Sequence, residues 1–279
     1  MDLGFLQLTS VAYLIASVAL GYQLLRADAR LATFGNSALS VGFLLHSMSI
    51  GLHFLSVGLG AITTFHEGLS FFAWLVVGSY LIVSRGQRLA VIGTIITPLA
   101  FAMTLGAVIM YGEGGGGGVP ESFHSPWLPV HVTLAFLGNA VFGVAFAISV
   151  VYLVQENSLK SRRRGALSRK LPSLEQLDRL NYRCLAWGFP LLSLGILSGG
   201  IWALNAYGRF WSWEAREVLS LLTWILYGSL LQFRLTQGLR GRRAAALTIL
   251  GFGLVVVSFL SINLLSVPGR HGGGGGIGS

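Results

Sequence analysis

The chain has 279 residues, of which 53% are hydrophobic and 10% are charged, and its mean hydropathy is +0.71. Because about a quarter of the residues in soluble domains are charged, this composition excludes a soluble globular protein and predicts a membrane protein. The net charge of +9 is compatible with nucleic-acid binding, but the basic residues lie on alternate connections between apolar runs, as the positive-inside rule predicts. We therefore expect contact with membrane lipid and no nucleic-acid partner. The lone cysteine, Cys184, excludes a disulfide framework, a CxxC reductant and a c-type cytochrome.

Eight apolar runs are each long enough for a transmembrane helix, which needs about 20 residues. The predicted spans are residues 5–25, 36–58, 69–84, 89–111, 129–154, 184–206, 217–236 and 244–266. The whole chain, residues 1–279, is therefore expected to form a single integral membrane domain, an all-α polytopic helix bundle. The first span lacks a basic leading segment and an AxA-like cleavage site, so we expect a retained helix rather than a signal peptide.

Clusters of basic residues follow the odd-numbered spans and predict the topology. They are Arg26 and Arg30 after the first span, Arg85 and Arg88 after the third, a run from Lys160 to Arg183 after the fifth, and Arg234, Arg240, Arg242 and Arg243 after the seventh. Such residues favour the cytoplasmic side, so both the N-terminus and the C-terminus are expected outside. Residues 202–217 then face outward, although Arg209 and Arg216 depart mildly from the rule.

The connections divide into glycine-rich external segments and a basic internal segment. Residues 112–128 and 267–279 have glycine runs and are expected to be an external loop and a flexible external tail. Residues 155–183 are expected to be a basic cytoplasmic loop. Within it, residues 172–182 have leucines at helical spacing, and Ser173 with Gln176 fits a capping box. We expect a short amphipathic helix there, lying on the inner surface against the bundle.

Two of the six histidines, His46 and His53, lie within the second span, where ionisable groups are costly and often mark functional sites. They are seven residues apart, which places them about 10.5 Å apart on one helical face, too far for both to ligate one iron. His46 is a candidate ligand of a second metal site, and the alternative for either residue is an interhelical hydrogen bond. His66 and His124 fall in predicted loops and are expected to be solvated.

The other two histidines are expected at the outer surface. His131 begins the fifth span and His271 follows the eighth, at the level of residues 202–217. Neutral imidazole is a common axial ligand of haem iron, so these two residues are candidates to bind one iron from opposite sides. On position alone, a structural role for each is the alternative.

Residues 202–217, WALNAYGRFWSWEARE, form a tryptophan-rich segment at this predicted boundary. Its tryptophans have a plain explanation as an interfacial aromatic belt. Three features favour a ligand site instead: closely spaced indoles, glycines that permit close backbone approach, and neighbouring charges. The residues concerned are Trp202, Trp211 and Trp213, then Gly199, Gly200 and Gly208, and then Glu214, Arg216 and Glu217. The combination suits a flat apolar ligand with acidic groups, such as haem, whose propionates Arg209 or Arg216 would pair.

The stretch LPSLEQLDRLNYRCLAWGFPLLSLGILSGGIWALNAYGRFWSWEARE resembles the WWD-domain membrane proteins of cytochrome c assembly, specifically the CcsA/ResC branch of system II. Four further stretches are similar to successive segments of that family, in the same order. They are FLLHSMSIGLHF, FHEGLSFFAWLVVGSYLI, WLPVHVTLAFLGNAVFGVAFAISVVYLV and FLSINLLSVPGRH. The resemblance covers nearly the whole chain.

The resemblance implies a helix bundle in the bacterial cytoplasmic membrane that binds haem b transiently and presents it at the periplasmic face. There, with a CcsB/ResB-like partner, it would promote haem attachment to the CxxCH motif of apocytochrome c, as a cytochrome c haem lyase. By position, His131 and His271 match the family's external haem ligands. The residues implied to contact the cofactor are Trp202, Gly208, Arg209, Trp211, Trp213, Glu214, Arg216 and Glu217. The chain has no obvious nucleophile or acid–base pair, so its contribution is expected to be proximity and orientation.

The chain departs from the family pattern at three places, one of which is the C-terminal end, where glycines follow His271 instead of the family's Ser-Tyr. The segment Trp213–Glu217 keeps the family's charge signs but lacks its proline, and Gln232 stands where the family typically has a histidine assigned to a second, intramembrane haem site. His46 and His53 are candidates to compensate for the missing histidine, although their spacing does not establish this role. Two alternative functions stay open: a HemX-like membrane protein that modulates haem biosynthesis, and a transporter for another small molecule.

Overall fold

The computed structural model describes residues 2–26, 28–58, 62, 64–85, 89–111, 125–161 and 171–265, with side chains up to residue 260. These residues form eight helices and no strand. The helices are α1 Leu3–Arg26, α2 Ala29–Val57, α3 Phe65–Val83, α4 Ala90–Ile109, α5 Trp127–Lys160, α6 Leu174–Tyr207, α7 Ala215–Thr236 and α8 Arg242–Leu265. All eight are long and apolar enough to cross a membrane, which confirms the predicted all-α, multi-pass membrane bundle.

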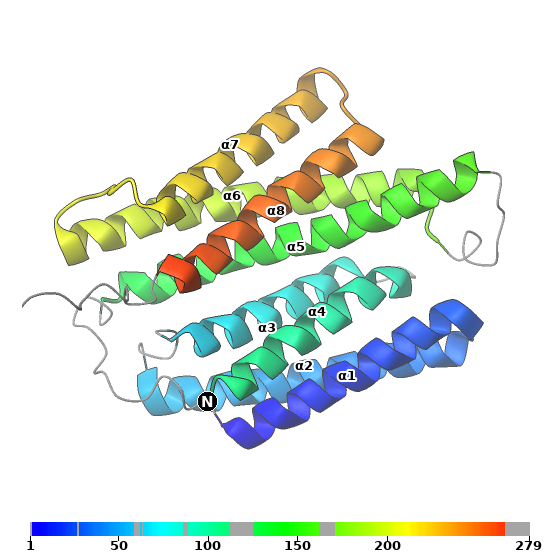
Figure 1. Ribbon diagram of the computed structural model, residues 1–279, viewed down its shortest axis with the longest axis horizontal. Helices are drawn as coiled ribbons and strands as arrows, with labels where there is room; N and C mark the ends of the chain where they lie inside the picture. Colours follow the sequence, from blue (N-terminus) through cyan, green and yellow to red (C-terminus); the bar gives the residue numbers. More distant parts are fainter. Residues whose placement is uncertain are drawn as a thin grey trace, which may run out of the picture.

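The helices lie nearly side by side along the long axis of the molecule, alternating in direction (Figure 1). α1–α4 form one group and α5–α8 the other, and α3 and α4 pack against α5 to join them. Large buried aromatic side chains fill both groups. In the second group, the Phe142 and Tyr227 rings are stacked with their centroids 3.8 Å apart.

Glycines allow α5 and α6 to pack backbone against backbone. A Cβ atom on Gly195 would lie 2.8 Å from the Cα of Ala135, and one on Gly138 would lie 2.8 Å from the backbone nitrogen of Leu192. Real Cβ contacts are not this short, so only glycine fits at these two positions. Small residues at helix interfaces are typical of membrane bundles. This close crossing places the first turns of α5 against the last turns of α6.

The structure corrects the prediction of a separate short helix at residues 172–182. α6 begins at Leu174 and continues without a break to Tyr207, although it contains Pro190. Ser173 does cap it, because its Oγ accepts a hydrogen bond from the backbone N–H of Gln176 at 3.2 Å. The reason for the continuity is that Leu177 and Leu180 are buried in the bundle, on the same stripe as the rest of α6. The connection predicted at residues 155–183 is therefore helical at both ends, since α5 reaches Lys160.

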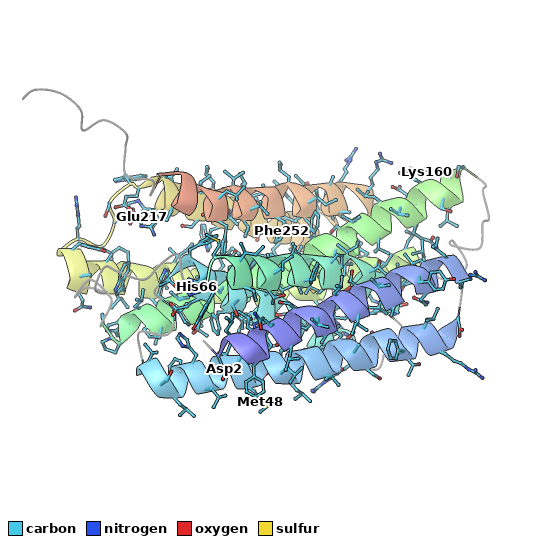
Figure 2. The ribbon with its side chains drawn as sticks, turned by 60° about the horizontal axis from the view of Figure 1, so that its bottom comes forward. Asp2, Met48, His66, Lys160, Glu217 and Phe252 are labelled. Carbon is cyan, nitrogen blue, oxygen red and sulfur yellow. The ribbon has the colours of Figure 1, made fainter. Side chains whose placement is uncertain are left out.

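The two ends of the bundle differ in charge. The odd-numbered helices finish at one end, here called the basic end, which bears Arg26, Arg85, Lys160 and Arg234 (Figure 1). α3, α5 and α7 begin at the other end, here called the tryptophan end, where residues 202–217 lie. Figure 2 shows Lys160 at one end and Glu217 and His66 at the other. This clustering agrees with the charge alternation along the sequence; which side of the membrane each end faces stays a prediction.

Three predicted connections lie wholly or mostly outside the described residues. They are the glycine-rich loop at 112–128, described only from Ser125, the basic residues 162–170, and the tail at 267–279.

Candidate functional site

The tryptophan segment turns sharply between α6 and α7. α6 ends at Tyr207 and is capped by Gly208, whose left-handed backbone (φ 70°, ψ 11°) lets its N–H donate to the carbonyl of Leu204 at 3.0 Å. Residues 209–214 are not helical, and α7 begins at Ala215. Within this turn Trp213 has φ 60°, an uncommon and strained conformation for a bulky residue. The strain and the 73% exposure of Trp213 indicate an indole placed for a purpose other than folding.

Glu217 fixes this turn from the first turn of α7. Its Oε2 accepts a hydrogen bond from the backbone N–H of Ser212 at 2.7 Å. The carboxylate also lies near the N-terminus of α7, where the helix dipole favours negative charge. Glu214 and Arg216 instead form an exposed ion pair at 3.2 Å, which is easily exchanged for a ligand. Glu217 is thus placed to hold the turn, and its predicted contact with a cofactor stays a prediction.

His131 lies on α5 against the last turns of α6 and is half-buried. Its Nδ1 is 2.7 Å from the carbonyl oxygen of Gly195. A carbonyl only accepts hydrogen bonds, so Nδ1 carries the proton and Nε2 keeps a lone pair. Metal-binding histidines commonly have this arrangement, because the backbone bond fixes both the tautomer and the ring orientation.

Two consecutive glycines of α6, Gly199 and Gly200, each leave space for a neighbouring aromatic or imidazole ring. A Cβ atom on Gly199 would lie 2.6 Å from Cε1 of His131, and one on Gly200 would overlap the ring of Phe210. The sequence predicted close approach at these glycines, and the structure identifies the two rings that approach them. Trp202 follows one turn later, with its ring parallel to that of His131 (interplanar angle 4°) and the centroids 6.3 Å apart.

Trp211 has a buried indole N–H with no hydrogen-bond acceptor among the described residues. Buried polar groups are nearly always paired, so this donor requires an explanation. Its ring meets Trp213 edge to face at 6.0 Å, and exposed Tyr207 and Phe210 complete an aromatic edge on this end of the bundle. Exposed Arg209 lies within the same turn.

The structure therefore brings His131 together with the tryptophan segment, as predicted. His271, the other predicted axial ligand, lies outside the described residues. α8, which precedes it, finishes at Leu265 at the tryptophan end (Figure 1). The described residues contain no group of three or more His, Cys, Asp or Glu side chains arranged to hold a metal ion.

His46 is fully buried, and both of its ring nitrogens have partners. Nδ1 is 3.2 Å from the hydroxyl of Tyr13, and Nε2 is 2.9 Å from the hydroxyl of Ser70. This arrangement agrees with the interhelical hydrogen bond considered as the alternative to metal ligation. Gln232, at the position where the family typically has a histidine, is exposed on α7 rather than turned into the bundle.

His53 and His66 also have structural partners near the tryptophan end. Nε2 of His53 is 2.8 Å from Oε1 of Glu67, and Glu67 itself closes the capping box of α3 with Thr64. His66, expected to be solvated in a loop, lies in the first turn of α3 with its ring edge-on to Tyr111 at 5.8 Å. His66 is helical because α3 begins at Phe65, whereas hydropathy predicted that the span begins at residue 69.

Residues 62–267 match the family described as Cytochrome C assembly protein. Relatives named cytochrome c biogenesis protein CcsA include those of Gloeothece citriformis (27% identical; 86% of this chain and 87% of the relative), Guillardia theta (29%; 80% and 79%) and Chlamydomonas reinhardtii (31%; 75% and 60%).

The solved structure of a cytochrome c haem lyase, CcmF, has the same fold over 94% of this chain, with a TM-score of 0.62 and 17% identity. The chain spans about half of that protein, 48% of its length. The family match covers most of the chain and includes α5, α6 and α7, which build the site. The chain therefore belongs to the cytochrome c assembly protein family.

Proposed function

We propose that this protein binds haem at the tryptophan end and presents it for covalent attachment to apocytochrome c. The observation that carries the proposal is the geometry of His131, whose Nδ1–H bond to Gly195 leaves Nε2 as the iron-coordinating atom. Family membership supports the choice of haem, because the curated relatives named above are cytochrome c biogenesis proteins.

The surroundings of His131 fit a porphyrin. An axial imidazole stands roughly perpendicular to the porphyrin plane, so Trp202, parallel to His131, would flank the imidazole instead of lying on the porphyrin. The exposed rings of Phe210 and Trp213 offer apolar surface to the macrocycle. The unpaired indole N–H of Trp211 is a donor for a propionate, and Arg209 and Arg216 supply the matching charge.

In the attachment reaction, the bonds form between haem and the client, and this chain forms no covalent bond itself. A cysteine thiol of the client adds across a haem vinyl group: the C–S bond forms on one vinyl carbon and the thiol hydrogen ends on the other. The chain therefore acts by holding haem where the vinyl groups meet the client's CxxCH thiols. Its own thiol, Cys184, is buried within α6 and takes no part.

We infer the remaining assignments from topology and resemblance. The basic end faces the cytoplasm and the tryptophan end faces the periplasm of a bacterial cytoplasmic membrane. His271 supplies the second axial ligand, haem b is held only until it is attached to the client, and a CcsB/ResB-like membrane protein completes the lyase. The names of the curated relatives favour this function over modulation of haem biosynthesis.

Absorption spectroscopy of the purified protein, produced with ample haem supply, tests the proposal. Wild type is expected to show a haem Soret band, and His131→Ala is expected to lose most of it. His46→Gln, which alters a histidine bonded within the bundle, serves as the control and is expected to keep its haem. Wild type without haem, or equal haem content in wild type and His131→Ala, contradicts the proposal.

A further inference from the structure

A cavity of about 740 Å³ lies at the basic end, far from the proposed haem site. Its lining residues come from α5, the start of α6, the end of α7 and the turn between α7 and α8. These elements meet at the basic end of the bundle (Figure 1). Its polar lining includes Tyr152, Asp178, Arg179, Tyr182, Arg234 and Arg240. The function proposed above uses none of these residues.

The floor of the cavity is an ion pair that is already complete. The side chain of Arg234 is 4% exposed, and its Nη2 donates to Oδ2 of Asp178 at 2.8 Å. Nη1 of Arg234 donates to Asn181 at 3.1 Å, and the other oxygen of Asp178 accepts from the backbone N–H of Gly241 at 3.1 Å. Since the charge of Asp178 is neutralised and both its oxygens are bonded, it does not exclude an anion from the space above.

The mouth of the cavity has cations that are available to a ligand. Arg179 is bonded to Glu175 at 2.7 Å, but both side chains are mostly exposed, so this pair is weak. Arg240 is exposed, and no described carboxylate pairs with it. The three arginines and two carboxylates of the lining leave a net charge of +1. The hydroxyl groups of the lining tyrosines, Tyr152 and Tyr182, add hydrogen-bond donors.

The same cavity has an apolar wall. Leu174 and Leu235 line it, and Leu235 is 67% exposed on the outer face of α7. The space is also several times larger than a phosphate ion requires. A ligand that fills it should therefore combine an anionic group with a hydrophobic part, at the level where a membrane helix ends.

We propose that this cavity binds the headgroup of an acidic phospholipid. Arg179 and Arg240 bind the phosphate, the tyrosine hydroxyls donate to its oxygens, and the acyl chains lie along Leu235. Guanidinium groups match phosphate geometry, and basic pockets between membrane helices are known to suit anionic headgroups. Because the cavity joins α6 to the turn between α7 and α8, bound lipid stabilises the basic end of the second helix group.

Native mass spectrometry and thermal unfolding of the detergent-solubilised full chain test the proposal. The probes are dioleoyl phosphatidylglycerol, dioleoyl phosphatidylcholine and inorganic phosphate. Wild type is expected to bind phosphatidylglycerol and to unfold at a higher temperature in its presence, with little response to the other two. The double variant Arg179→Gln, Arg240→Gln is expected to bind phosphatidylglycerol about thirtyfold more weakly, because it lacks two surface cations.

The control is the double variant Arg30→Gln, Arg85→Gln, which removes equal charge from the same end but away from the cavity. It is expected to bind phosphatidylglycerol as wild type does. Equal weakening in both double variants would show general surface attraction and overturn the proposal. Saturable binding of inorganic phosphate that displaces the lipid would assign the site to a free anion and would overturn it as well. Haem content, measured in parallel, reports on the tryptophan end independently.

Discussion

Replacing Gly199 by alanine perturbs the orientation of His131 without adding or removing any polar group. The added Cβ would lie 2.6 Å from Cε1 and 2.7 Å from Nδ1 of the imidazole. The ring must move away from α6, and its 2.7 Å hydrogen bond to Gly195 lengthens or breaks. The lone pair of Nε2 then no longer has the direction that the Gly195 bond fixes.

The expected cost follows from opposing terms. Overpacking costs about 1–3 kcal/mol. Loss of the hydrogen bond adds about 1 kcal/mol. Alanine regains roughly 1 kcal/mol over glycine in a helix. The net destabilisation of about 1–3 kcal/mol should lower the unfolding temperature modestly while the bundle still folds, so loss of haem would reflect the site itself.

The assay is the haem-to-protein ratio and the Soret band of purified Gly199→Ala, together with its thermal unfolding. Gly253→Ala is the matched control, because a Cβ at that helical position meets no atom within 4 Å. We expect Gly199→Ala to lose most of its haem and Gly253→Ala to keep it. If Gly199→Ala retains the haem content and spectrum of wild type, His131 does not depend on this contact and the reasoning is refuted.

Three further predictions concern the tryptophan turn and the basic end. Glu217→Ala should loosen the turn and reduce haem binding, whereas Glu217→Gln, which keeps an acceptor oxygen, should restore much of it; equal spectra for both would contradict a positioning role. Trp213→Gly should relieve about 1–3 kcal/mol of backbone strain, raising the unfolding temperature while weakening haem retention. Asp178→Asn leaves Arg234 buried beside a neutral group and should destabilise by about 3 kcal/mol or more in thermal unfolding. Glu175→Gln, in an exposed pair, should change stability by less than about 1 kcal/mol, and similar effects of the two would contradict the assignment.

The number and order of the spans follow from hydropathy, because the bilayer imposes one helix length on every crossing. Hydropathy does not predict where each helix begins and ends. The start of α6 looks amphipathic in sequence, yet Asp178 and Asn181 turn into the bundle and meet Arg234 there. Periodicity alone does not identify a partner 56 residues further along the chain, so the sequence did not reveal that this stretch is the beginning of α6 and is bonded to α7.

The sequence predicts which residues meet at the site, but it does not predict the hydrogen bonds that orient them. His131 and the tryptophan segment were expected to meet at one end of the bundle, and they do. Sequence alone did not reveal the acceptor that sets the tautomer, because Gly195 contributes only a backbone carbonyl. Sequence alone also did not reveal that Glu217, the third residue of α7, accepts a hydrogen bond from the backbone N–H of Ser212; its predicted contact with the cofactor stays a prediction. The residue type of Glu217 predicts a negative charge at this position. The place where α7 begins determines that this carboxylate bonds to the backbone of the turn.

α6 connects the two ends of the molecule as one rigid element. Its first turns carry Asp178, which is fixed to α7, and its last turns carry Gly195, Gly199 and Trp202, which orient His131. A one-residue change of register along α6 would rotate its side chains by about 100° and would remove Gly199 from the imidazole. The break predicted from sequence near residue 183 would have left these two ends independent. Because the helix is continuous, the ion pair at the basic end and the close crossing with α5 together fix the height and rotation at which the imidazole meets α6.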